Sequence, residues 1–363
     1  MQFALIAFSV GLWAFRIGEF KSAIGFSHTE FSWLLLLPPI AGTITMNYTP
    51  RFARKIGVVR VLQLGAGMWT IGALGLSLIP PLPVIILLFL AMGICAAFFE
   101  VGLGTVAQKL DRDTGAIVSS CHGFWSIGFA LGGFVASVLA NGKINFLQQE
   151  LIFVPIIIAL VIIYSKPLPH PRTIAEENSG HGLPSLAILP LCLIPLAALF
   201  IEGAVADWNS VYLLSERHWG EIATGSVFAS FMFAMALTRL IGDRLRARFS
   251  AVKLLSISTS MSIVGMLFYA FGDNVFIVFI GAFVAGMGAG NVYPLALVIA
   301  NIGRDEEDSS QIISSIAMVS FTAFLFAPVF MGWIGDAFSL ATAYALTIPL
   351  LILTFLWMKL ARV

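Results

Sequence analysis

The sequence predicts an all-α membrane protein with twelve transmembrane helices arranged as two six-helix bundles. Three observations predict this: 59% of the 363 residues are hydrophobic and 11% are charged, apolar runs recur at membrane-spanning length, and basic residues alternate between successive connections. A soluble domain carries about 25% charged residues, so the composition excludes one. Uninterrupted apolar runs containing Gly and Pro indicate helices, whereas an outer-membrane barrel shows short alternating segments.

Twelve apolar runs are long enough to cross a bilayer, which takes about 20 helical residues. The first run has no basic residues before it and no small-residue cleavage site after it, so we expect a span rather than a signal peptide. The runs cover residues 1–18, 29–48, 58–79, 83–107, 115–140, 149–165, 185–213, 220–240, 252–271, 274–300, 310–334 and 339–358.

The basic residues predict the orientation, because cytoplasmic connections retain Lys and Arg. Of the twenty, sixteen lie in the even-numbered connections and the C-terminal end, and only Arg16, Lys21, Lys143 and Arg217 lie in the odd-numbered connections. This asymmetry places both termini in the cytoplasm and supports an even number of spans. The net charge of +1 offers nothing to attract nucleic acid.

The chain also contains an internal repeat. Residues 49–62 align without gaps on residues 242–255, so that Arg51 falls on Arg244, and the offset of 193 residues is about half of the chain. Two six-helix halves related in this way are typical of transporters that alternate access to a central site.

The repeat defines the expected domain organisation. We expect an N-terminal bundle over 1–165, a cytoplasmic loop over 166–184 and a C-terminal bundle over 185–363, because the polar stretch at the midpoint separates two equal sets of spans.

The loop around the second repeat carries Gly242, Asp243 and Arg244, followed by Arg246 and Arg248. This pattern resembles the loop motif of the major facilitator superfamily, and the resemblance covers the whole chain. It implies alternating-access transport, with Asp243 and Arg244 in an inter-helix charge network that takes part in gating.

Further motifs are similar to those of the fucose-permease-like branch of the superfamily, and more closely to bacterial permeases of mostly unassigned substrate. The resemblance implies that Glu100 is the proton-binding acid. The motif residues are Trp13 with Arg16, Glu100, Ser119 and Ser120 with His122, and Glu202, Gly203, Ala206, Asp207 and Trp208.

Ionisable groups inside a span are costly, so each is a functional candidate. Counting about 1.5 Å per residue from the helix centres places Glu100 about 7 Å and His122 about 9 Å to the cytoplasmic side. An acid and an imidazole at one depth could switch protonation together as a cavity opens. The alternative is a static hydrogen-bonded helix pair.

The seventh predicted span offers a third proton-coupling candidate, Glu202, which shares a helix face with Asn209. Asp207 points about 140° away from that face. We expect Arg16 to pair with Glu202 or Asp207 in an outer gate. The alternative is that Arg16 extends to the membrane interface as an isolated charge.

Amide, phenol and indole groups are the candidates for solute binding, since they hydrogen-bond and stack on hydroxyl-rich molecules. Asn291 and Tyr293 lie beside a Gly-rich stretch, and the 193-residue offset aligns Tyr293 with Glu100. Asn209, Trp13 and Trp125 complete the set. Packing within a bundle is the alternative for each.

The sequence therefore predicts a secondary active transporter of a small polar solute, a sugar or related metabolite, coupled to protons, monomeric and in a bacterial inner membrane. A proton-coupled exporter of amphipathic compounds is the alternative, and a receptor or assembly factor is less favoured. No nucleotide, metal or catalytic motif appears, so we expect no cofactor and no enzymatic activity. Three cysteines in apolar runs predict neither disulfides nor zinc sites.

Overall fold

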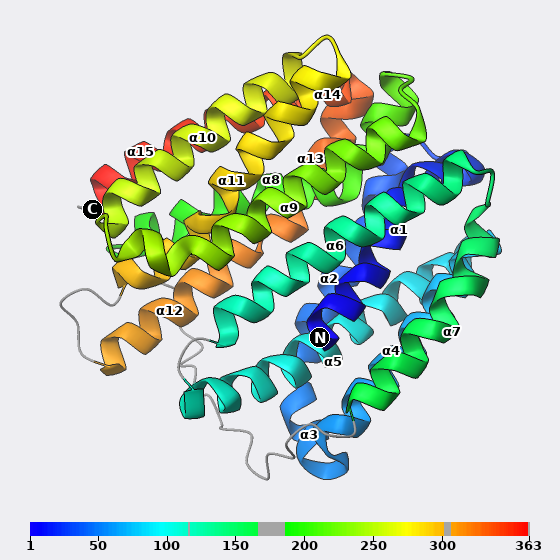
Figure 1. Cartoon of the computed structure of the whole chain (residues 1–363), viewed down its shortest axis with the longest axis horizontal. Coiled ribbons are helices and arrows are strands. Elements are labelled where there is room, and N and C mark those ends of the chain that lie inside the picture. Colours follow the sequence, from blue (N-terminus) through cyan, green and yellow to red (C-terminus); the bar gives the residue numbers. More distant parts are fainter. Residues whose placement is uncertain (115–116, 166–185, 301–305, 362–363) are drawn as a thin grey trace. The chain divides into compact units, whose positions relative to one another are not determined.

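The computed structural model describes residues 1–114, 117–165, 186–300 and 306–361, with the side chains of residues 108–114, 117–119, 165, 243, 306–311 and 314 outside that description. The predicted loop at 166–184 also lies outside the described residues. Within the described part the chain is helical, and no strand occurs there (Figure 1).

The helices follow the apolar runs. Those before residue 166 are α1 (Gln2–Ile24), α2 (His28–Met46), α3 (Thr49–Ile56), α4 (Val58–Ser77), α5 (Leu82–Thr114), α6 (Ile117–Asn141) and α7 (Phe146–Ser165). Those after residue 185 are α8 (Leu189–Val211), the π-helical turn η1 (Tyr212–Glu216), α9 (Glu221–Arg246), α10 (Ala251–Phe271), α11 (Val275–Ala300), α12 (Glu306–Phe321), α13 (Ala323–Ala337), α14 (Leu340–Ala345) and α15 (Thr347–Leu360).

Eleven stretches of helix in the described residues are long and apolar enough to cross a membrane. The predicted second span corresponds to α2, which is not among the eleven. Its first turn carries His28, Thr29 and Glu30, and Pro38 and Pro39 lie inside it, so its mean hydropathy is lower. A capping box between Ser27 and Glu30 fixes its start.

Some boundaries differ from the prediction. The run 310–334 is divided between α12 and α13, and the run 339–358 between α14 and α15. Pro349 lies in the first turn of α15 and has no backbone N–H to donate, which accounts for the second interruption. The repeat segment at 49–62 contains the short amphipathic helix α3, whereas its partner segment lies at the junction of α9 and α10.

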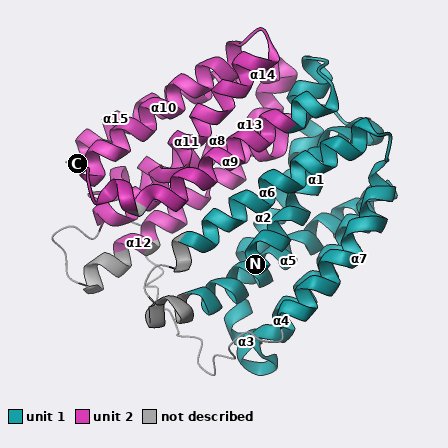
Figure 2. Ribbon diagram, viewed as in Figure 1, with its two compact units in different colours: residues 1–176, 210–225 teal, residues 177–209, 226–363 magenta. Residues whose placement is uncertain are grey.

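The chain divides into two compact units, coloured separately in Figure 2. Unit 1 comprises residues 1–176 and 210–225, and unit 2 comprises residues 177–209 and 226–363. The end of α8, η1 and the start of α9 therefore pack with the N-terminal helices, although the prediction from chain order assigns them to the C-terminal bundle.

Unit 1 is built around a close crossing of α1 and α6. A Cβ atom on Gly128 or Gly132 of α6 would collide with the carbonyl oxygens of Ala4 or Phe8 on α1, and one on Gly11 would collide with Phe129. Small residues allow this close approach. Van der Waals packing between the helices then stabilises their association, because lipid provides no hydrophobic driving force between them. Helix α5 packs against α2 and α4, and α7 against α1 and α4.

Unit 2 uses the same principle, with α10 packed closely on α11. A Cβ atom on Gly265 would collide with the backbone of Ala285. A separate apolar cluster joins Leu199 and Phe200 of α8 to Ala323 and Ala327 of α13. These contacts hold α8, which carries several candidate residues, in the interior of the unit.

Candidate functional site

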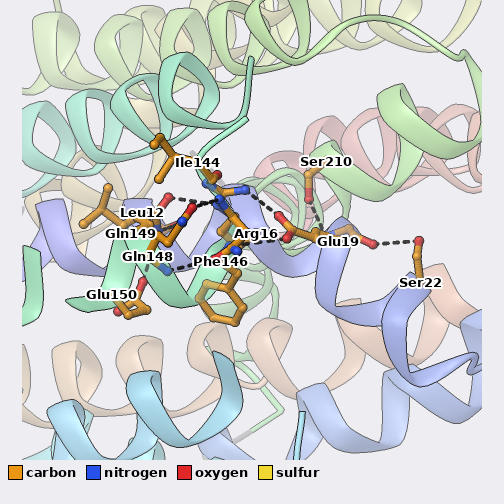
Figure 3. Close-up of polar contacts among 12 residues, drawn as sticks. Leu12, Arg16, Glu19, Ser22, Ile144, Phe146, Gln148, Gln149, Glu150 and Ser210 are labelled. Carbon is orange, nitrogen blue, oxygen red and sulfur yellow. Dashed lines mark hydrogen bonds and ion pairs between the residues drawn. The ribbon is translucent and has the colours of Figure 1, made fainter. Parts of the chain in front are cut away.

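Arg16 is a deeply buried charge of unit 1, with 2% of its side chain exposed. Its Nε donates to Oε1 of Gln149 at 2.9 Å and its Nη2 donates to the carbonyl oxygen of Ile144 at 2.7 Å. Its Nη1 forms an ion pair with Glu19, one turn further along α1. Figure 3 shows this network, which ties α1 to the start of α7.

The network continues along α7 to a second buried acid. Gln149 is fully buried, and its amide nitrogen donates to Oε1 of Glu150 at 3.0 Å and to the carbonyl oxygen of Leu12 at 3.5 Å. Glu150 is 2% exposed. The amide of Gln149 therefore bridges Arg16 to Glu150, so one cation lies within a chain of two carboxylates and an amide.

A cavity of about 430 Å³ lies beside this network. The second half of α1 provides Arg16, Glu19 and Ser22, and the α6–α7 connection provides Lys143 and Asn145. The remaining wall consists of Leu214 and Ser215 from η1 and Glu221 from the start of α9. All of these residues belong to unit 1.

Residues 210–225 reach unit 1 through small side chains. The backbone N–H of Gly18 donates to the hydroxyl of Ser210 at 3.1 Å, and that hydroxyl donates to the carbonyl oxygen of Ala14 at 3.3 Å. A Cβ atom on Gly225 would collide with Ser137 of α6. Helix α1 thus carries both the Arg16 network and the contact that holds one wall of the cavity.

The partners of Arg16 differ from the expected ones. Within unit 1, Arg16 binds Glu19, Gln149 and Ile144, because α1 continues past the predicted end at residue 18 and puts Glu19 on the same face. The pairing of Arg16 with Glu202 or Asp207, which belong to unit 2, stays a prediction. Asp207 is half-buried on α8 and has no hydrogen bond or ion pair among the described residues.

Glu202 has a different cation as its partner. Its Oε2 lies 3.2 Å from Nη2 of Arg239 on α9, and the two side chains are 14% and 12% exposed. Arg239 stands next to the predicted end of the span 220–240, but α9 extends to Arg246 and places Arg239 within the candidate span Glu221–Gly242. An inter-helix ion pair inside unit 2 is the result.

Asn209 takes part in a polar cluster one to two turns from Glu202. Tyr269 of α10 donates to Oδ1 of Asn209 at 2.8 Å, and Tyr344 of α14 donates to the carbonyl oxygen of Ala204 at 3.0 Å. The two phenol rings meet edge to face with centroids 4.8 Å apart. Asn209 is therefore engaged in side-chain packing between α8 and α10.

The structure does not join Glu100 and His122. Glu100 lies exposed on α5 and has no hydrogen bond or ion pair among the described residues. His122 is exposed on α6, and its ring packs edge-on against Phe3 with centroids 6.1 Å apart. Ser119 of the same motif lies outside the described side chains.

The remaining solute-binding candidates are mostly packed. Trp13 is 7% exposed and contacts the rings of Phe20, Phe89 and Phe146. Trp125 is half-buried on α6.

In unit 2, Asn291 is 4% exposed and its Oδ1 faces Gly242, close to where a Cβ atom would lie. Tyr293 lies edge-on to Phe321 and packs beside the cluster formed by α8 and α13. Arg244 is exposed near the end of α9, and the Asp243 side chain lies outside the described part.

No group of three or more His, Cys, Asp or Glu side chains in the described residues is placed to hold a metal ion. Glu19, Gln149, Glu150 and Arg239 are the polar residues that sequence reasoning missed. Glu19 stands three residues after Arg16, and residues at this spacing are neighbours on a helix. A first helix predicted to extend beyond residue 18 would have indicated this ion pair.

Many apolar helices define a multi-pass membrane protein, and ion pairs and acids without a partner among the described residues lie inside them. The model of the Major Facilitator Superfamily matches residues 1–206 and 191–363. The chain therefore belongs to that superfamily and is a transporter of unassigned substrate.

Its relatives agree with this assignment. The chain is 26% identical over 348 residues to an uncharacterised transporter of Sinorhizobium fredii, covering 92% of this chain and 89% of the relative. It is 24% identical over 355 residues to an uncharacterised transporter of Yersinia pestis, covering 98% and 92%. The crystal structure of the nucleoside transporter NupG superposes with a TM-score of 0.76 at 13% identity, covering 99% of this chain and 98% of that one.

Proposed function

We propose that the protein is a secondary active transporter that couples the movement of a small polar solute, a sugar or related metabolite, to protons. The observation that carries the proposal is Glu100, a carboxyl group inside the candidate span Leu82–Ala107 with no partner among the described residues. A carboxylate in a span has to be met by a proton, water, a cation or a polar solute. Coupling to protons supplies such a partner in each transport cycle.

Two further acids fit this function differently. Glu202 has Arg239 as its counter-ion, so a proton on Glu202 would release the arginine for another partner, such as an anionic or hydroxyl group of the solute. His122 lies on α6, the helix that follows α5, and can hold a proton near neutral pH. We assign proton coupling to Glu100, His122 and Glu202.

The solute class is argued from polar groups buried in unit 2. Asn209, Tyr269 and Asn291 are buried side chains that can exchange hydrogen bonds with hydroxyl groups. Trp13 and Trp125 add aromatic surface in unit 1. NupG is a nucleoside transporter, so nucleosides join sugars, sugar acids and polyols among the solutes to be tested.

The proposed setting is a bacterial inner membrane, with both termini in the cytoplasm and the chain acting as a monomer. The distribution of basic residues supports this orientation. The boundaries 1–165, 166–184 and 185–363 remain our proposal for the two bundles and the loop between them. Asp207, Asp243, Arg244 and Arg16 remain the proposed gating residues, with Arg16 acting through its bonds to α7.

The test is solute-induced proton movement in proteoliposomes that contain a pH-sensitive dye. Sugars, sugar acids, polyols and nucleosides are screened against the wild type and Glu100→Gln, with Asp273→Asn in an exposed loop as the matched control. We expect one solute to move protons with the wild type and the control but not with Glu100→Gln.

Solute uptake without proton movement, equal in all three proteins, would refute the coupling. Silence of the folded wild type across the panel, with proton-dependent efflux of amphipathic compounds, would refute the polar-solute proposal in favour of export.

A further inference from the structure

The cavity of unit 1 has the dimensions of a small-molecule site. Its volume of about 430 Å³ falls in the range of about 300–1,000 Å³ that is typical of ligand pockets. Its walls come from three separate segments, namely α1, the α6–α7 connection and residues 214–221. In the predicted topology these are all external ends of helices.

The charges around the cavity divide into a paired set and an unpaired set. Arg16 and Glu19 neutralise each other, and Gln149 and Ile144 occupy further donors of the guanidinium group. Because Arg16 is buried and Glu19 is already paired with it, the two form a neutral polar wall with little charge to offer a ligand.

Lys143 and Glu221 are the unpaired set. Both line the cavity, and neither side chain has a hydrogen bond or ion pair among the described residues. Lys143 lies on the α6–α7 connection and Glu221 at the first residue of α9, so the two opposite charges come from different walls. Lys143 also has a left-handed backbone, with φ of 64°, a conformation that costs a non-glycine residue energy and often marks a functional position.

Between these charges the cavity offers neutral hydrogen-bonding groups. Ser215 lies exposed on η1, and Asn145 adjoins Lys143 on the α6–α7 connection. Phe15 and Leu214 provide apolar surface for the body of a ligand. A ligand with a single negative charge would pair with Lys143 and be repelled by Glu221. A ligand with a single positive charge would pair with Glu221 and be repelled by Lys143.

We infer that this cavity binds a small zwitterion, whose anionic group meets Lys143 and whose cationic group meets Glu221. A molecule with a carboxylate at one end and an ammonium at the other satisfies both charges at once, and opposite complementarity of this kind discriminates against singly charged ligands. The site lies within unit 1, includes the proposed gating residue Arg16 in its wall, and faces the outside in the predicted topology.

The test is calorimetric titration of the purified full-length protein in detergent. The probes are a series of amino acids with increasing charge separation: glycine, β-alanine, 4-aminobutyrate and 6-aminohexanoate. Butyrate, butylammonium and butyramide serve as the matched anionic, cationic and neutral probes. We expect at least one zwitterion to bind about tenfold more tightly than all three single-function probes.

The variants Lys143→Gln and Glu221→Gln should each weaken that binding by about two- to fivefold, as expected for partly exposed ion pairs. Lys21→Gln and Glu30→Gln, which lie at the same predicted end of the molecule but outside the cavity, should leave it unchanged. Glu100→Gln should also bind as the wild type does, so that a failure of proton coupling does not affect this result.

Equal binding of zwitterionic and singly charged probes would overturn the inference. So would the absence of binding by every zwitterion in the series, or binding that persists unchanged in both cavity variants.

Discussion

The ion pair between Glu202 and Arg239 allows a quantitative test, because its two ends are not equivalent. Arg239 keeps its charge under all practical conditions, whereas Glu202 can be neutralised by a proton. Replacing Glu202 with Gln leaves a fixed cation inside the helices of unit 2. Replacing Arg239 with Gln leaves an acid that can take up a proton. The two single variants should therefore differ in stability.

The magnitude follows from the geometry. At 3.2 Å the attraction is about 5 kcal/mol with an effective dielectric constant of about 20, and desolvation of both groups offsets part of it. Because both side chains are less than one sixth exposed, we expect Glu202→Gln to lower the free energy of unfolding by about 3 kcal/mol. Arg239→Gln should lower it by about 1 to 2 kcal/mol, and the double variant by no more than Glu202→Gln alone.

Equilibrium unfolding in mixed SDS and dodecylmaltoside micelles, followed by tryptophan fluorescence, measures these differences. Arg248→Gln, an exposed residue just after α9, is the control and should change stability by less than about 0.5 kcal/mol. The double-mutant cycle should give a coupling energy of about 2 kcal/mol. Additive costs of the two single changes, or a cost of Glu202→Gln no larger than that of the control, would refute the reasoning.

Three further predictions concern packing and the Arg16 network. In the same unfolding assay, Arg16→Gln should cost about 3 kcal/mol, since it leaves buried acceptors unpaired, whereas Glu19→Gln, with a 43% exposed side chain, should cost less than about 1 kcal/mol. Size-exclusion chromatography should show loss of the folded-protein peak for Gly132→Ala, which has no space against α1, but not for Gly104→Ala, which has nothing within 4 Å. Tyr269→Phe should lower stability in a thermal scan by about 1 to 2 kcal/mol, because buried Asn209 loses its donor.

The sequence is sufficient to predict most of the helices, because the length of an apolar run is set by the thickness of the bilayer. It is less informative where polar residues continue a helix. The apolar run ends at residue 18, because the residues that follow it include the charged Glu19 and Lys21. In the structure α1 continues six residues further, to Ile24. Glu19, one of the two charged residues that obscure the helix end, provides the ion pair with Arg16.

Pairing between helices is not contained in the sequence pattern. Glu202 was recognised as a candidate from its place in an apolar run, but no spacing relates it to Arg239, 37 residues away. Similarly, Gln149 and Glu150 stand at the edge of a predicted span, where polar residues are ordinary. Only the packing of α7 on α1 shows that they are buried around Arg16.

The two arginine pairs differ in what they can transmit. Arg16 and Glu19 lie on one helix, so their separation is fixed by helical geometry and does not change when helices move. Glu202 and Arg239 lie on α8 and α9, so any displacement between these helices strains or breaks the pair. A proton on Glu202 would have the same consequence, because it would remove the counter-charge of Arg239. Within unit 2, the proposed protonation and helix movement would therefore act on one interaction, which is the physical requirement for coupling them.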